Sequence, residues 1–204
     1  LRLAAAGARI ILLDRCCNDE ASQELFASLP GEGHWMVEAS VTDSPALAAV
    51  AEEVVRRYGR LDILVNNAGI TRFVAHADLD GLDDDTIDEI FQVNWRGAFA
   101  CVRAFKALLA ADPGGLVINM SSVAAQTGFG SNVAYCASKA ALNSMTLSLA
   151  RALAPAIRVV AIAPGFVLGE YARRADPAML QEQVRKTPLG RLAGQVVPAD
   201  REVT

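Results

Sequence analysis

Short apolar runs and longer segments with helical spacing alternate along the 204-residue chain. The short runs are rich in β-branched and aliphatic residues, and they predict buried strands at residues 10–13, 35–37, 61–65, 116–120 and 157–163. Apolar residues recur every three to four positions at residues 46–58, 84–110 and 133–154, which predicts helices. Alternating strands and helices need crossover connections, so the sequence predicts an α/β fold: a doubly wound parallel sheet with helices on both faces.

Composition limits the domain count and the classes of partner. Apolar residues make up 52% of the chain, and no linker or repeat divides residues 1–204, which predicts a single domain. The 19 basic residues form no dense run and the net charge is −4, so we expect no nucleic-acid partner. The apolar runs are far shorter than the roughly 20 residues of a membrane-spanning helix, so we expect no membrane partner either.

Cysteine and histidine positions bear on compartment and metal content. The cysteines have neither a CxxC spacing nor the spacing of a disulfide framework, which favours a reducing cytoplasm. They are Cys16, Cys17, Cys101 and Cys136. His34 and His76 lie far apart without a nearby metal-ligating partner, so no metal is expected.

Polar or turn-forming residues follow four of the predicted strands. In a doubly wound sheet, ligands bind beyond the carboxyl ends of the strands. The residues at those positions are Asp14, the Asn-Asn-Ala-Gly segment 66–69, Ser121 with Ser122, and Pro164 with Gly165. We therefore expect them to outline one crevice.

Tyr135 and Lys139 are spaced i, i+4 in a predicted helix, so both side chains lie on one helix face. A tyrosine phenol has an ordinary pKa near 10 and is a poor acid or base at neutral pH. A nearby ammonium group favours the phenolate and lowers that pKa. This pair therefore indicates a tyrosine that exchanges a proton with a substrate oxygen, although the same spacing also occurs on solvated helix faces.

Several motifs occur here in the order found in the short-chain dehydrogenase/reductase family, which the chain resembles along nearly its whole length. They are Asn66-Asn67-Ala68-Gly69, Val93-Asn94-Trp95, the Ser122 segment, Tyr135-Cys136-Ala137-Ser138-Lys139 and Pro164-Gly165. The resemblance implies a nicotinamide-dependent oxidoreductase that acts on a small-molecule secondary alcohol or ketone. A 3-oxoacyl-acyl carrier protein reductase that uses NADPH is an alternative within the class.

The resemblance also implies four catalytic residues. Tyr135 would be the proton donor or acceptor, and Lys139 would tune it and hold the nicotinamide ribose. Ser122 would bind the substrate oxygen, with Ser121 as the alternative, because the family's serine usually precedes its tyrosine by the 13 positions that separate Ser122 from Tyr135. Asn94 would support a proton relay to the lysine, or it could simply kink or cap a helix.

Residues at the strand ends are implied to bind the cofactor. They are Asp14, Val41, Asn67, Ala68, Gly69, Tyr135, Lys139, Pro164, Gly165 and Val167. The small residues of the 67–69 turn permit close approach of a ribose, although this segment and Pro164-Gly165 could equally be plain turns. Near Val41 the family usually has an aspartate where this chain has Ser40, which puts one adenine contact in doubt.

Asp14 bears on the choice of cofactor. A carboxylate at the end of the second strand accepts hydrogen bonds from ribose hydroxyls and repels a 2′-phosphate. The sequence therefore favours NAD over NADP, although Arg15 could offset part of that repulsion.

The chain departs from the family at both ends. It lacks the first strand and the glycine-rich pyrophosphate turn, and residues 193–204 do not resemble the family's last helix and strand. We expect an incomplete domain, with an apolar slot beside the missing strand. An inactive fragment that serves as an interaction module is therefore the alternative from another class. The apolar residues of segment 133–154 and the resemblance together predict a homo-dimer or homo-tetramer.

Overall fold

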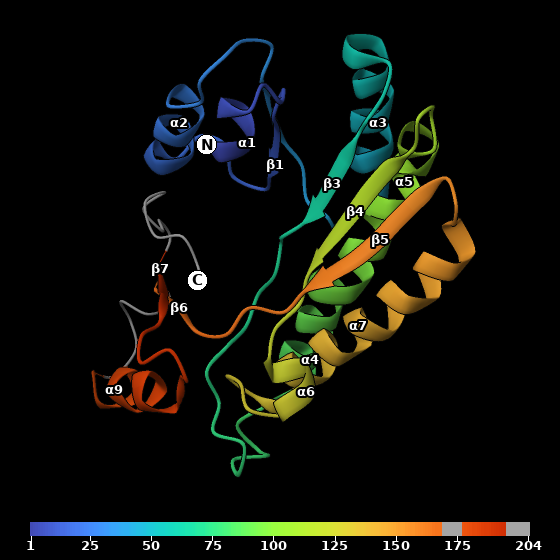
Figure 1. Cartoon of the computed structure of the whole chain (residues 1–204). Coiled ribbons are helices and arrows are strands. Elements are labelled where there is room, and N and C mark those ends of the chain that lie inside the picture. The colour runs from blue at the N-terminus through green and yellow to red at the C-terminus, as the bar shows by residue number, and fades with distance from the viewer. Residues whose placement is uncertain (169–176, 195–204) are drawn as a thin grey trace.

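The structure is a computed structural model that describes residues 1–168 and 177–194 (Figure 1). Parallel strands with connecting helices make it an α/β fold, so the predicted fold class is confirmed. Each apolar run predicted as a strand overlaps one. The strands are β1 Ile11–Asp14, β2 Trp35–Glu38, β3 Ile63–Asn66, β4 Gly115–Met120, β5 Ile157–Ile162, β6 Val167–Leu168 and β7 Ala193–Gly194.

Strand pairing divides the described strands into the sheets β1–β2, β3–β4–β5 and β6–β7, all parallel. β4 is the central strand of its sheet, with Val117 level with Leu64 on β3 and Val159 on β5. Because the strands of a parallel sheet point the same way, the carboxyl ends of β3, β4 and β5 meet at one edge.

The helices begin and end where local capping chemistry allows. Asp19, Asp43, Asp83 and Asn132 each accept a hydrogen bond from the backbone N–H three residues on, and α3 ends at Gly59, whose φ is 73°. The helices are α1 Arg2–Ala5, α2 Glu20–Ala27, α3 Ser44–Tyr58, α4 Asp84–Phe91, the π-helix η1 Gln92–Gly97, α5 Ala98–Leu109, α6 Ala124–Thr127, α7 Val133–Leu153 and α9 Pro177–Lys186.

The single helix predicted over residues 84–110 is wrong in detail, because the π-helix η1 separates α4 from α5. A π-helical segment widens the turn and often marks a functional position. Here it carries buried Asn94, whose side chain bonds other segments, and Gly97, where an added Cβ would lie 2.6 Å from Cγ2 of Val41. Tertiary contacts of this kind cannot be read from the apolar spacing.

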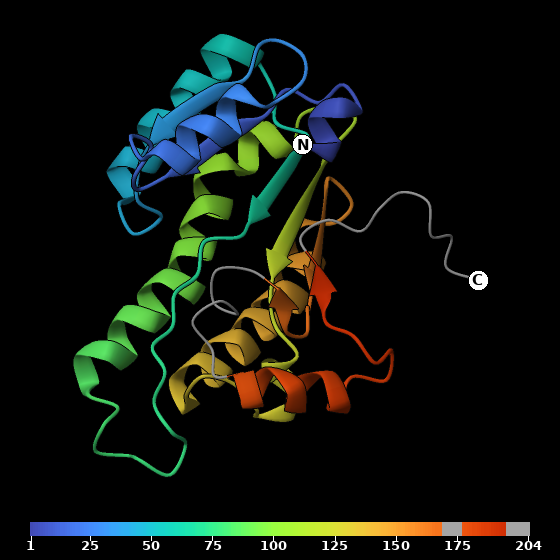
Figure 2. The ribbon, with the colours of Figure 1, turned by 90° about the vertical axis from the view of Figure 1, so that its left-hand side faces the viewer.

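The core lies between α3, α5 and the strands. Leu47, Val54, Leu109 and Val117 are at most 1% exposed and belong to this cluster. α5 and α7 cover one face of the β3–β4–β5 sheet, as two perpendicular views show (Figures 1 and 2). Alternate residues on the opposite face keep between 40% and 48% of their surface exposed; they are Ile63, Val65, Val160 and Ile162.

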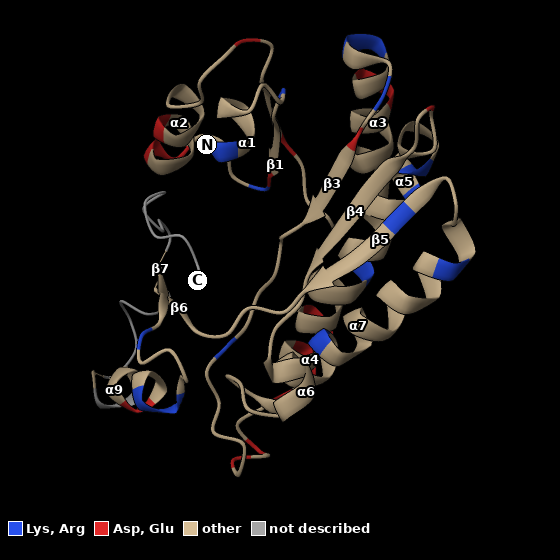
Figure 3. Cartoon of the chain, in the orientation of Figure 1, with Lys and Arg blue, Asp and Glu red and all other residues tan. Residues whose placement is uncertain are grey.

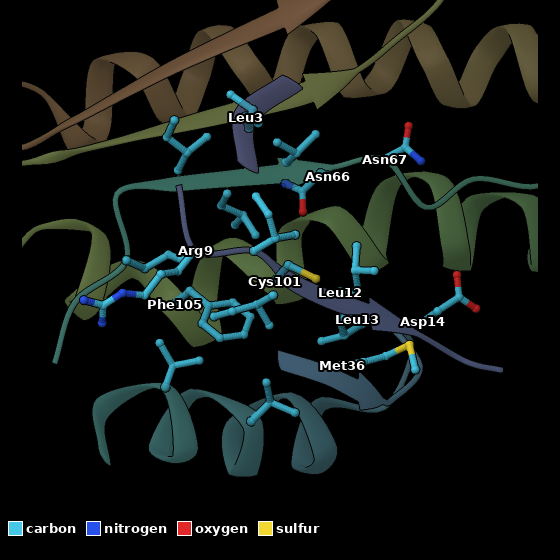
Figure 4. A pocket seen from close by; sticks show the side chains of 18 of the residues that line it. Leu3, Arg9, Leu12, Leu13, Asp14, Met36, Asn66, Asn67, Cys101 and Phe105 are labelled. Atoms are coloured by element: carbon cyan, nitrogen blue, oxygen red, sulfur yellow. The ribbon is translucent and has the colours of Figure 1, made fainter. Parts of the chain in front are cut away.

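A cavity of about 870 Å³ lies between β1 and β3. Its lining is largely aliphatic and aromatic, and Leu12, Cys101 and Phe105 are among the side chains that face it (Figure 4). β1 pairs only with β2 and β3 only with β4 among the described strands, so the edges that flank this cavity have no strand partner there. The predicted departure at residues 193–204 falls largely on residues 195–204, outside the described part of the chain.

Basic side chains are spread over α3, α5, α7 and α9, and acidic side chains lie on α2, α3, α4 and α9 (Figure 3). Within residues 1–168 and 177–194, no helix combines the length and the apolar character needed to cross a bilayer.

Candidate active site

Most of the residues predicted for the site follow the carboxyl ends of strands, and the fold gathers these ends along one edge. Asp14 ends β1 and Asn67 follows β3, and Figure 4 shows both side chains at the same end of the cavity. The segments after β4 and β5 are joined by two backbone bonds: Ser121 donates to the carbonyl of Ile162 at 2.8 Å, and Val123 to that of Pro164 at 3.0 Å. These two bonds hold the segments that follow β4 and β5 together at this edge of the sheet.

Tyr135 and Lys139 lie in the first two turns of α7, as the i, i+4 spacing predicts. Nζ of Lys139 is 5.7 Å from the centroid of the Tyr135 ring and donates a hydrogen bond to the carbonyl of Met120 at 2.8 Å. Lys139 is only 5% exposed, and its burial lowers its pKa from 10.5 to about 8. At neutral pH the side chain is therefore still mostly protonated and holds a positive charge beside the phenol ring.

The two serines after β4 have different surroundings. Ser121 is 6% exposed, and its hydroxyl donates to the backbone carbonyl of Lys139 at 3.3 Å. Ser122 is half-buried, and its Oγ accepts a hydrogen bond from the N–H of Ala124 at 3.1 Å, which leaves the hydroxyl proton free to donate. The hydroxyl of Ser122 can therefore donate to a further group, whereas that of Ser121 is used to hold the backbone of α7.

Asn94 joins the segment that follows the 67–69 turn to α7. Its Oδ1 accepts from the N–H of Ile70 at 2.8 Å, while Nδ2 donates to the carbonyl of Ile70 and to Oγ of Ser138, both at 3.0 Å. The residue is 1% exposed and lies within η1, at the irregular turn between α4 and α5. Its part in a proton relay stays a prediction.

Gly69 lies close to two polar side chains of the site. An added Cβ would lie 3.3 Å from Oδ1 of Asn94 and 3.4 Å from Nζ of Lys139. The first separation is tighter than an ordinary contact, so an added side chain would press on the Asn94 amide, while the second is an ordinary van der Waals contact with the lysine. The glycine therefore leaves room around the lysine.

The predicted adenosine side is more open. Asp14 is exposed, and its Oδ1 accepts from the N–H of Cys16 at 3.1 Å. Val41 is half-buried beside Gly97. Ser40, which stands where the family usually has an aspartate, uses its hydroxyl within its own turn, 2.8 Å from Oγ1 of Thr42.

A buried polar chain beneath the site was not predicted from the sequence. Nδ2 of Asn66 donates to Oδ1 of Asn119 at 2.8 Å, and Nδ2 of Asn119 donates to Oγ1 of Thr146 at 2.9 Å. Asn119 is 0% exposed, so its amide depends on these two partners. A polar residue inside the apolar run 116–120 was the available signal. Asn132, three residues before Tyr135, was also missed.

Metal ligands are not grouped in the described ranges, where no three or more His, Cys, Asp or Glu side chains come together in a way that could hold an ion. The predicted cofactor residues 164, 165 and 167 lie after β5, and Val167 begins β6 with 37% of its surface exposed.

Comparison with known proteins places this geometry in a family. A family model described as enoyl-(acyl carrier protein) reductase matches residues 1–199. Galactitol 2-dehydrogenase of Agrobacterium fabrum is 36% identical over 203 residues, which cover 93% of this chain and 77% of that protein. The 3-oxoacyl-(acyl-carrier-protein) reductase of Staphylococcus aureus strain Mu50 is 33% identical over 162 residues, which cover 79% of this chain and 65% of that protein.

Structural similarity leads to the same family. The structure of NAD⁺-bound xylitol dehydrogenase superimposes with a TM-score of 0.85 at 30% identity, covering 95% of this chain and 80% of that one. The chain belongs to the short-chain dehydrogenase/reductase family, whose members are oxidoreductases that exchange a hydride between a nicotinamide cofactor and a small-molecule substrate. It spans 65% to 80% of the length of the three proteins named here.

Proposed function

We propose that the protein carrying this chain is an NAD-dependent dehydrogenase/reductase that interconverts a secondary alcohol and a ketone, with Tyr135 as the general acid and base. The observation that carries the proposal is the buried ammonium of Lys139, which lies 5.7 Å from the Tyr135 ring centroid and is held by the carbonyl of Met120. Such a pair gives a phenol the acid–base function that it lacks in water.

The residues present fit a nicotinamide cofactor at two positions. Gly69 keeps the space beside Lys139 free of a side chain, so Nζ of Lys139 can also donate to a ribose hydroxyl. Asp14 presents an exposed carboxylate at the end of β1. The remaining proposed cofactor contacts belong to the turns at Asn67, Ala68, Pro164, Gly165 and Val167 and to Val41.

Proton transfer is the task of Tyr135. Its phenol would donate a proton to the substrate oxygen during reduction and take one back during oxidation. The bound cofactor supplies or accepts the hydride. Lys139, protonated at neutral pH because its pKa is about 8, stabilises the phenolate that remains after donation.

Ser122 and Asn94 complete the proposed centre. The hydroxyl proton of Ser122 would point to the substrate oxygen and fix it near the phenol, since its Oγ lone pair is already used by Ala124. Asn94 bonds both Ile70 and Ser138, so it holds the segment after the 67–69 turn against α7. We assign it a supporting role in the proton relay to Lys139.

The preference for NAD rests on Asp14, whose charge would oppose a 2′-phosphate. NAD⁺-bound xylitol dehydrogenase supports the same choice by similarity. A second candidate is a 3-oxoacyl-(acyl-carrier-protein) reductase with NADPH, favoured by the similarity to the Staphylococcus aureus enzyme of that name. An exposed carboxylate at Asp14 argues for the first.

We also propose a homo-dimer or homo-tetramer located in the cytoplasm. Leu147 on α7 is 62% exposed and Val133 at its start is 46% exposed, which leaves apolar surface for a second copy. A light-scattering mass at micromolar concentration tests this assembly. The four cysteines are free thiols, as in a reducing compartment.

The deciding experiment is a substrate and cofactor panel with the protein that carries this chain. Secondary alcohols, including polyols, are offered with NAD⁺ or NADP⁺, and a 3-oxoacyl thioester is offered with NADH or NADPH, while absorbance at the reduced nicotinamide band is followed. We expect polyol or simple secondary alcohol oxidation with NAD⁺. Turnover confined to the thioester with NADPH would instead favour the second candidate, and no turnover on any pair would contradict both.

A further inference from the structure

Two buried asparagines fasten the short segment 70–72 to α7. Asn94 holds its first residue, Ile70, and bonds Ser138 one turn into the helix. Asn132, the residue before α7, holds the other end of the segment, at Arg72. The segment directly follows the 67–69 turn that is proposed to contact the cofactor.

Asn132 uses both ends of its side-chain amide. Its Oδ1 accepts from the backbone N–H of Tyr135 at 2.6 Å, and its Nδ2 donates to the carbonyl of Arg72 at 2.6 Å and to Oγ1 of Thr71 at 3.4 Å. The residue is 1% exposed. One planar group therefore bonds the N–H of the proposed catalytic tyrosine and the loop opposite it.

A helix cap alone requires less than this. Serine, threonine and aspartate can cap a helix as well as asparagine, because capping needs only an acceptor oxygen. The donor half of the Asn132 amide has no part in capping, yet it is buried and bonded to the loop. The amide therefore meets a second requirement, namely a fixed separation between segment 70–72 and the first turn of α7.

Neighbouring bonds strengthen this junction. The hydroxyls of Thr71 and Ser131 are hydrogen-bonded, and the N–H of Val74 donates to the carbonyl of Ser131 at 3.0 Å. Nε2 of His76 lies 3.1 Å from the carbonyl of Gly130. The loop is thus attached along residues 130–132, and Asn132 is the member of that group which also bonds Tyr135.

We infer that Asn132 is a positioning residue that sets Tyr135 relative to Lys139 and the cofactor turn. The inference rests on the proposed function, because it assigns no chemistry of its own to Asn132. Tyr135 is in the first turn of α7, where the cap determines the path of the backbone. Small displacements of a reacting group reduce rate strongly, so loss of the junction should lower kcat more than it changes cofactor binding.

The test uses variants that separate capping from positioning. Asn132→Ser keeps an acceptor for the N–H of Tyr135 but is too short to reach the carbonyl of Arg72 at the same time. Thr71→Val leaves the cap untouched and removes the hydroxyl that contacts Asn132 and Ser131. Asp43→Ala is the control, since it removes the cap of α3 and is expected to lower Tm without affecting kcat.

We expect Asn132→Ser to lower kcat about tenfold, with the KM for NAD within about twofold of wild type. The apparent pKa that governs kcat should rise, because a phenol held away from Lys139 ionises less readily. Thr71→Val should also lower kcat and raise the apparent pKa, each by a smaller amount than Asn132→Ser. It provides the test if Asn132→Ser does not fold.

An unchanged kcat and pH profile in Asn132→Ser, or in Thr71→Val where the serine variant does not fold, would reduce Asn132 to a helix cap and overturn the inference. Tyr135→Phe is assayed in parallel. If that variant keeps its activity, the proposed function itself fails, whereas a dead Tyr135→Phe beside a normal Asn132→Ser refutes only the positioning role.

Discussion

The β3–β4–β5 region and the β1–β2 region hold their functional residues in different ways. Beneath the proposed catalytic residues, a buried chain runs from Asn66 through Asn119 to Thr146, with each bond 2.8 to 2.9 Å long. It ties β3, β4 and α7 together. At the end of β1, by contrast, Asp14 is exposed, and its carboxylate accepts a hydrogen bond from the N–H of Cys16, only two positions along the chain.

This difference indicates a division of tasks. Buried, mutually bonded polar groups fix the position of α7, so substitutions there should affect rate and stability together. An exposed carboxylate at a strand end can select between two ligands without supporting the fold, so substitutions there should change cofactor preference alone. The following predictions would break or sharpen this contrast.

The largest effect is expected at Lys139. Lys139→Ala should reduce turnover about a thousandfold and also weaken cofactor binding, because it removes both the charge beside Tyr135 and a proposed ribose donor. Steady-state kinetics and calorimetric titration with NAD measure the two effects. Lys106→Ala, an exposed lysine on α5, is the matched control and should behave as wild type. A mild loss at Lys139, equal to that of the control, would remove the lysine from the mechanism.

The same lysine should leave a signature in the pH dependence of stability. Its pKa is about 8 in the folded protein and 10.5 ordinarily, so between these values the unfolded chain binds more protons than the folded one. The free energy of unfolding should therefore rise from pH 8 to pH 10.5, by up to roughly 3 kcal/mol from this group. In Lys139→Met, the free energy of unfolding measured in urea should change less with pH over that range. If the free energy of unfolding changed with pH equally in both proteins, burial would not lower the pKa of Lys139 as described.

The buried polar chain is tested by Thr146→Val. This change keeps the shape of the side chain but leaves Nδ2 of Asn119 without its partner, which should cost about 1–3 kcal/mol of unfolding free energy. Ser148→Ala on the exposed side of α7 controls for removing a helix hydroxyl that is outside the buried chain. Equal values for the two variants would mean that the chain does not stabilise this region.

The smallest effect is expected at Asp14. Asp14→Ala should narrow the preference for NAD over NADP about tenfold in kcat/KM, which corresponds to about 1.4 kcal/mol, with Tm unchanged. Glu52→Ala on α3 is a control for loss of an exposed carboxylate. If the ratio of kcat/KM for NAD to that for NADP stayed the same, Asp14 would have no part in cofactor choice.

Residues whose spacing follows from local geometry were predictable from the sequence. The i, i+4 rule brings Tyr135 and Lys139 together, and the apolar runs locate the strand ends that carry Asp14 and Ser122. The break at Gln92–Gly97 was not predictable, because it depends on contacts of Asn94 with Ile70 and Ser138, which are distant in sequence.

The hydrogen bonds of Asn119 and Asn132 could not be predicted from the sequence, for a physical reason. Asn119 lies within an apolar run, so the sequence predicts only a strand at this position. The partners of its amide, Asn66 and Thr146, come together with it only in the folded chain. From the sequence, Asn132 is recognisable only as a helix cap. Its bond to Arg72 joins segments 60 positions apart and therefore leaves no local pattern. Long-range polar pairs leave little trace in hydrophobic periodicity.

The most direct test of the account compares turnover and cofactor affinity in Tyr135→Phe. Removing only the phenol oxygen should lower kcat about a thousandfold while calorimetry gives a Kd for NAD within about twofold of wild type, because the ring and its packing remain. A variant that keeps most of its kcat would show that Tyr135 is not the acid–base group and would contradict the proposed chemistry of this site.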